Sequence, residues 1–138
     1  MSQENVEFLR SLLDGARGLD KAALVAALPD LIPQACDPEI EWVEDPRRAD
    51  GRIYRGHEGV RASWERWLEN FEEYGFEVES IRDHGDRVLT VAVEHARGSA
   101  SAAEVSARIY GVYTFRAGRV LRYEEFYDER DALAALER

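Results

Sequence analysis

Glu125 and His95 have side chains suited to proton transfer, and both fall on predicted strands. On the last predicted strand, residues 120–127, alternation places Glu125 on the more apolar face with Tyr123, and Glu124 on the other face; one bulge would exchange them. A carboxyl group in an apolar interior has its pKa raised by desolvation, toward the range useful for a general base near neutral pH. The alternative interpretation is a strand-end glutamate that is solvated or paired with an arginine.

His95 is predicted to assist Glu125. It shares one face of the predicted strand 88–97 with Leu89, Val91 and Val93, and this face is the more apolar one. An imidazole there can act as an acid, donate a hydrogen bond to a carbonyl oxygen, or orient Glu125. The other interpretation is a buried histidine with satisfied hydrogen bonds and no catalytic part.

Aromatic side chains are predicted to surround the same interior. A phenol preset in a dry pocket can stabilise a developing enolate, and indole rings can form the wall of a site for a flat apolar ligand. Packing in the core is the alternative for each of them. Glu44, on the face of Trp42, is expected either at the pocket mouth or in solvent. The predicted ligand-contacting residues are Trp42, Tyr54, Trp64, Trp67, Tyr113 and Tyr123.

Other chemistries have little support in the sequence. No two of the histidines His57, His84 and His95 have the short spacing of a metal pair, so no metal site is predicted. No serine has the context of a nucleophile elbow, and no glycine-rich phosphate loop follows a strand. The single cysteine, Cys36, is expected to be a buried and inert thiol.

The elements that must position these residues are helical first and strand-rich later. Apolar residues at helical spacing predict helices around residues 6–13 and 24–28. Pro29 and Pro33 are expected to interrupt the second pattern, before a short strand around residues 40–44. A long loop, DPRRADGR, is predicted to follow.

A third helix is predicted from about Glu58 to about Tyr74, because one apolar stripe runs from Val60 to Phe71. The remaining chain predicts antiparallel strands separated by the turn DHGD, a loop of small residues GSASAA, and the turn RAGR. A short last helix is expected, with Asp128 as its N-cap. The predicted strands cover residues 76–82, 88–97, 105–115 and 120–127.

Size and composition fit one α+β domain over residues 1–138, with 45% hydrophobic residues. A net charge of −10 argues against nucleic acid as a partner. The sequence has no apolar run of about 18 residues and no signal-peptide pattern at its start, so we expect no membrane partner and a cytoplasmic location.

The element order and several motifs resemble the SnoaL-like branch of the nuclear transport factor 2-like superfamily, over about residues 3–136. The motifs are Tyr54-Arg55-Gly56-x-x-Gly59-Val60, Gly85-Asp86-Arg87-Val88, and Gly118-Arg119-Val120 leading to Asp128. They are typical of the fold and say little about function, because members include polyketide cyclases, isomerases, epoxide hydrolases, dehydratases and non-catalytic binding or dimerisation domains.

The resemblance implies a cone in which a strongly curved antiparallel sheet wraps around three helices and leaves an apolar pocket. It implies an acid on the last strand, seven positions after the turn glycine Gly118, which is Glu125 where an aspartate is usual. Gly111 stands where close relatives often carry a pocket histidine. Catalytic members use no metal and no organic cofactor. The resemblance also implies a homodimer through the outer sheet faces, to which Arg108, Tyr110, Val112 and Thr114 would contribute.

The sequence therefore predicts a small acid–base enzyme of the isomerase, cyclase or hydratase type. Its substrate would be a small apolar molecule with a carbonyl group, with Glu125 as base, His95 assisting, and Tyr54 or Tyr113 as donor. The alternative is a non-catalytic small-molecule-binding or dimerisation module of the same fold.

Overall fold

The computed structural model describes residues 2–48, 51–98 and 104–138. Part of the predicted loops at 45–52 and 98–103 lies outside these residues. The elements follow in the order α1 (Ser2–Arg17), α2 (Lys21–Ala35), β1 (Cys36–Val43), β2 (Ile53–Arg55), α3 (Gly56–Leu68), β3 (Phe71–His84), β4 (Arg87–Gly98), β5 (Glu104–Arg116), β6 (Arg119–Phe126) and α4 (Glu129–Leu136).

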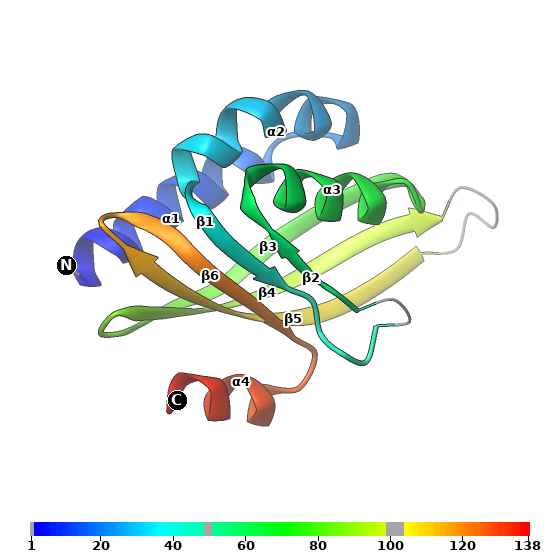
Figure 1. The fold of residues 1–138 in the computed structure, drawn as a ribbon. Helices are drawn as coiled ribbons and strands as arrows, with labels where there is room; N and C mark the ends of the chain where they lie inside the picture. Colours follow the sequence, from blue (N-terminus) through cyan, green and yellow to red (C-terminus); the bar gives the residue numbers. More distant parts are fainter. Residues whose placement is uncertain (1, 49–50, 99–103) are drawn as a thin grey trace.

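The strands form one six-stranded sheet in the order β2-β1-β6-β5-β4-β3. Neighbouring strands are antiparallel except β1 and β6, which pair in parallel, so the sheet is mixed and the prediction of a purely antiparallel sheet is wrong at this pair. Figure 1 shows α1, α2 and α3 on one face of the sheet and α4 on the opposite face. This arrangement confirms the predicted α+β class with three N-terminal helices and a short C-terminal helix.

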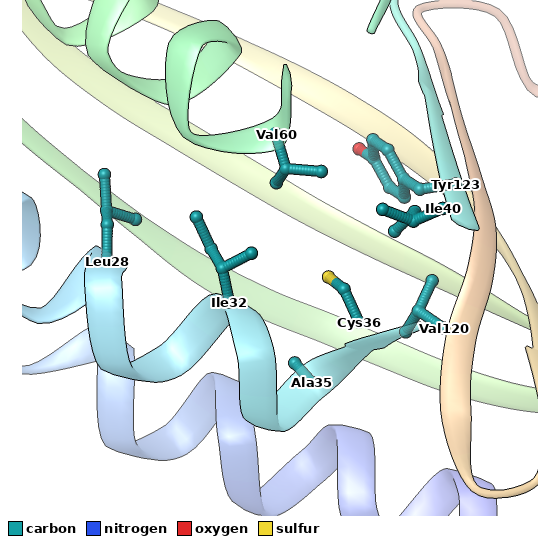
Figure 2. Close-up of a cluster of buried hydrophobic side chains, with 8 residues drawn as sticks. All are labelled: Leu28, Ile32, Ala35, Cys36, Ile40, Val60, Val120 and Tyr123. Carbon is teal, nitrogen blue, oxygen red and sulfur yellow. The ribbon is translucent and has the colours of Figure 1, made fainter. Parts of the chain in front are cut away.

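The main core cluster lies between the helices and the inner face of the sheet (Figure 2). Cys36 belongs to this cluster, and its burial raises the pKa of the thiol to about 12, so the thiol stays protonated and unreactive. The buried cysteine was predicted. The cluster contains Leu28, Ile32, Ala35, Cys36, Ile40, Val60, Val120 and Tyr123.

The prediction that prolines interrupt the second helix is wrong, because Pro29 and Pro33 lie inside α2. Both prolines are exposed, and they lie four residues apart on the solvent side of the helix. The carbonyl groups that lose a helical partner there can bind water instead. Leu24, Leu28 and Ile32 meanwhile bury the other side of α2 and hold it in place.

The third helix ends earlier than predicted, at Leu68 instead of near Tyr74. The side-chain amide of Asn70 donates hydrogen bonds to the carbonyl oxygens of Arg66 and Trp67, both at 3.3 Å, and so closes the last turn. Phe71 already belongs to β3, whose pairing with β4 runs as far as His84. The short strand β2 was not predicted.

The last helix, α4, starts as expected, since Asp128 accepts a hydrogen bond from the backbone N–H of Arg130 at 2.8 Å. The helix packs on the outer face of the sheet and buries Ala132 against Leu89 and Val112. Val112 is only 1% exposed, so the expectation that it contributes to an outer dimer surface is wrong. No described helix is long and apolar enough to cross a membrane.

Candidate functional site

A cavity of about 160 Å³ lies between the helices and the inner face of the sheet. Its wall is almost entirely apolar and comes from α1, α2, α3 and the strands. An apolar cavity of roughly 150 Å³ stays dry and can bind benzene. This main cavity therefore has room for an organic molecule of about the size of a six-membered ring.

A second, smaller cavity of about 60 Å³ adjoins the main cavity. The two share Trp42, Trp64, Glu94, Ile109 and Tyr123 as walls. The remaining walls of the smaller cavity are polar or aromatic, and we call this region the polar end. The polar end consists of Arg48, Ser63, Trp67 and Glu125, together with the shared Glu94.

Glu125 points inward from β6, as alternation predicted, and its side chain is 13% exposed. Nη1 of Arg48 donates to the two carboxylate oxygens at 3.2 and 3.4 Å, and the backbone N–H of Asp45 donates at 3.2 Å. Burial raises the pKa of the Glu125 carboxyl, while Arg48 and the N–H of Asp45 favour the ionised form. Glu125 is thus a buried acceptor with an arginine partner.

Arg48 connects several groups of the polar end. Its Nη1 lies 3.2 Å from Oε2 of Glu44 as well as from Glu125, and its guanidinium carbon lies 4.4 Å from the centroid of the Trp67 ring. Glu44 also accepts a hydrogen bond from Ser63 Oγ at 2.9 Å. The two alternatives for Glu44, solvent or pocket mouth, do not hold, because the residue is 3% exposed and lines neither cavity.

Glu94 on β4 is the second carboxyl group of the polar end, and it borders both cavities. It accepts a hydrogen bond from the phenol of Tyr74. Burial, and then the charge of Glu125, raise the pKa of the Glu94 carboxyl to about 7, although Tyr74, Arg48 and Trp67 pull it down. Near neutral pH this carboxyl group can therefore hold or release a proton.

Glu94 was missed because alternation placed its face of β4 outward. Both faces of β4 are in fact covered: Leu89 is buried beneath α4, while Glu94 faces the cavities. Leu89, the first residue of the apolar row, therefore packs against the last helix. Ala132 and Ala135 carry the signal for this packing, since two small residues three positions apart let a helix approach a sheet closely.

His95 lies on the outer face of the sheet and is exposed, so the expectation that it faces the interior is wrong. It lines neither cavity and is not brought together with Glu125. The reason is again that the face of β4 with Leu89 is the outer face of the sheet, and His95 shares that face. Glu94, its neighbour in sequence, takes the inward position predicted for His95.

Five of the six predicted ligand-contacting aromatics lie at the cavities. Trp42, Trp64 and Tyr123 line both cavities, Tyr113 lines the main cavity, and Trp67 lines the polar end. The rings of Trp42 and Tyr123 stack with centroids 4.1 Å apart.

Tyr54 lines neither cavity, so its predicted position in the pocket wall is wrong. Its hydroxyl accepts a hydrogen bond from Nη1 of Arg66 at 3.0 Å. The side chain of Tyr54 instead packs close to Gly59 near the start of α3.

Gly111 on β5 allows the tyrosine rings to approach the sheet. A Cβ at this position would lie 2.8 Å from Cε1 of Tyr123, 2.8 Å from Oγ1 of Thr90 and 3.2 Å from Cε1 of Tyr113. The space that a histidine would need is therefore filled by these rings. Among the described residues, no group of His, Cys, Asp and Glu side chains is arranged to hold a metal ion.

Residues 19–123 match the family model of the SnoaL-like domain. The chain belongs to the SnoaL-like domain family. The fold of this SnoaL-like chain is that of the nuclear transport factor 2-like and ketosteroid isomerase-like proteins. No curated protein matches the chain.

Solved structures similar to this SnoaL-like chain cover almost its whole length. TerC, co-crystallised with polyporic acid, is 18% identical with a TM-score of 0.69, over 98% of this chain and 99% of TerC. A nuclear transport factor 2-like protein from Burkholderia thailandensis is 22% identical with a TM-score of 0.72, over 97% of each chain. A ketosteroid isomerase-like protein from Catenulispora acidiphila, in complex with trimethylamine, is 16% identical with a TM-score of 0.68, over 93% of this chain and 90% of that protein.

Proposed function

We propose that this SnoaL-like protein is an acid–base catalyst that acts on a small apolar molecule with a carbonyl group. The observation that carries the proposal is the pair of carboxyl groups, Glu94 and Glu125, which reach the same small cavity from β4 and β6. Glu125 is the proposed base, as the sequence suggested. Glu94 replaces His95 as the proposed acid.

The surroundings of the two carboxyl groups support different roles for them. Arg48 and the N–H of Asp45 both donate to Glu125 and favour a carboxylate that can accept a proton. Glu94 has no arginine within ion-pair distance among the described residues, and its pKa is raised to about 7, so it can supply a proton. A pair of carboxyl groups whose environments differ in this way is suited to separate acid and base roles.

The main cavity supports an apolar ligand. Its aromatic walls, formed by Trp42, Trp64, Tyr113 and Tyr123, suit a ring or a flat group. TerC was crystallised with polyporic acid and the Catenulispora acidiphila protein with trimethylamine, so small organic molecules have been captured with this fold. The ligand's carbonyl oxygen would approach Glu94, which borders both cavities.

Isotope exchange with cyclohexanone as the probe tests the proposal. Binding is measured first by tryptophan fluorescence, because Trp42 and Trp64 line the main cavity. The bound ketone is then followed by mass spectrometry in water carrying both ¹⁸O and deuterium. We expect catalysed uptake of at least one isotope, and a loss on the order of 10²-fold or more in Glu125→Gln and Glu94→Gln, as for removal of a general acid or base.

The control is Glu77→Gln, since the Glu77 side chain is exposed on β3 and lines neither cavity. This variant should exchange at the wild-type rate. If cyclohexanone binds and takes up neither isotope, the proposed function is wrong.

The alternative, a binding module without catalysis, has one observation in its favour. Arg48 and Asp45 already occupy Glu125 with hydrogen bonds, and such a pair can serve structure alone. Binding of cyclohexanone without isotope uptake is the result that this alternative predicts.

A further inference from the structure

We propose that the small cavity holds a reacting water molecule, so that the reaction adds water to the ligand or removes it. This inference rests on the proposed function and narrows it to one class of reaction. The water would lie between a ligand in the main cavity and the proposed base, Glu125.

Glu94 lines both cavities, whereas Glu125 lines only the smaller one. A ligand in the main cavity can therefore touch Glu94 directly but meets Glu125 only across the smaller cavity. The described residues show no hydrogen bond between the two carboxyl groups. Whatever fills the smaller cavity must relay any proton transfer between the ligand and Glu125.

The size of the smaller cavity fits water. One water molecule occupies about 30 Å³ in the liquid, and a cavity of about 60 Å³ has room for it. The cavity is too small for an organic ring, which the main cavity of about 160 Å³ can accept. The two cavities thus have the sizes of a water site and a ligand site.

The polar groups around the smaller cavity also fit water, which needs two to four partners to be held in a buried site. The indole N–H of Trp67 is buried and forms no hydrogen bond of ordinary length among the described residues, although it lies near the Glu94 carboxyl and helps to lower the pKa of that group. Glu94 and Glu125 supply acceptors, and Arg48 lines the same cavity. The wall of the main cavity is mostly apolar, so water is favoured at the polar end, where charged side chains gather.

The chemistry balances without any further reactant. The water oxygen attacks the carbonyl carbon while Glu125 takes a proton from that water. The electron pair of the C=O double bond moves to the carbonyl oxygen, which takes a proton from Glu94. The product is a geminal diol, with Glu125 protonated and Glu94 ionised. Rotation of the diol followed by the reverse steps releases the original oxygen as water and restores both carboxyl groups.

The same cyclohexanone experiment separates this inference from the proposed function. Addition of water exchanges the carbonyl oxygen with ¹⁸O, whereas removal of a proton from the neighbouring carbon introduces deuterium. We expect ¹⁸O to enter at least about tenfold faster than deuterium, beyond the uncatalysed rates. Deuterium uptake without ¹⁸O uptake overturns the water site and leaves the acid–base proposal standing. Uptake of neither isotope overturns the acid–base proposal itself.

The substitution Trp67→Phe, in the wall of the smaller cavity, tests the water site. The substitution removes the N–H donor but keeps an aromatic face for Arg48, and Trp67 does not line the main cavity. We expect on the order of a tenfold loss of ¹⁸O exchange, the size of one lost hydrogen bond, with unchanged cyclohexanone affinity by calorimetry. Unchanged ¹⁸O exchange in this variant overturns the assignment.

A crystal structure of the wild-type protein provides a second measurement that does not depend on the variant's folding. We expect an ordered water oxygen within hydrogen-bonding distance of Trp67 Nε1 and of one of the two carboxyl groups. A side chain that fills this position instead also overturns the assignment.

Discussion

At the scale of single residues, Glu94 should make the stability of the protein depend on pH. The folded state raises the pKa of this carboxyl from the ordinary value of 4.5 to about 7, chiefly through burial. The unfolded chain therefore binds fewer protons at this site between these two values, and wild-type stability falls as pH rises through this range. In Glu94→Gln this contribution is absent.

Relative to the wild type, the free energy of unfolding of Glu94→Gln should rise by about 3 kcal/mol between pH 4 and pH 8. This figure follows from ~1.36 kcal/mol per pKa unit. The glutamine oxygen can still accept the hydrogen bond from Tyr74. Urea unfolding at both pH values measures the difference. Glu77→Gln is the control and should follow the wild type, because its side chain is exposed. Parallel pH profiles of the Glu94→Gln variant and the wild type would contradict the buried carboxyl group.

The site residues show which part of the candidate site could be predicted from the sequence. Alternation on β6 correctly turned Glu125 inward, because Arg122 and Glu124 make the opposite face of that strand charged. The same reasoning failed on β4, where Leu89 is apolar because α4 covers it. Alternation identifies the inward face only where the opposite face carries polar residues. The position of Arg48 had no signal, since it comes from a loop between β1 and β2.

At the scale of elements, β5 depends on the absence of a side chain at Gly111. A Cβ there would meet Thr90 and the rings of Tyr113 and Tyr123 at 2.8 to 3.2 Å. These rings are packed against each other, with centroids 4.8 Å apart, so they cannot easily move away. We expect Gly111→Ala to lower the free energy of unfolding by about 1–3 kcal/mol, as overpacking does.

The matched control is Gly75→Ala in β3, where a Cβ would have nothing within 4 Å. Alanine costs less backbone entropy than glycine in a strand, so this variant should be as stable as the wild type or slightly more stable. Thermal unfolding of both variants makes the comparison. Equal stability of the two variants would mean that the tyrosine rings adapt to a methyl group.

The helices and strands were largely predictable because their apolar periodicity is local. The errors lie where tertiary contacts decide. Pro29 and Pro33 remain in α2 because the opposite side of that helix is buried. Phe71 continued the helical stripe in sequence, yet it pairs in β3 because Leu24, Leu68 and Ala96 offer it a packing site there.

At the scale of the whole molecule, the two faces of the sheet have separate coverings. The inner face holds the cavities under α1, α2 and α3, and the outer face carries α4 (Figure 1). Arg87 fixes this last helix by donating to the carbonyl oxygens of Ala135 and Arg138, and Arg138 pairs with Glu124 at 2.9 Å. The predicted homodimer can therefore use only the part of the outer face that α4 leaves open.

We expect a chain shortened after Asp128, which lacks α4, to associate with itself. Its outer face would expose Leu89 and Val112, which are 0% and 1% exposed in the full chain, together with Phe126. An apolar patch of this kind on a sheet promotes association. Size-exclusion chromatography with light scattering should give about twice the mass of the full-length species per particle, or more, while circular dichroism retains the strand signal. Leu133→Gln in the full chain is the control, because Leu133 is 40% exposed and faces away from the sheet contacts. If the shortened chain keeps the association state of the full chain, then the surface beneath α4 does not promote association. The outer surface of the sheet must then be polar enough to remain in water.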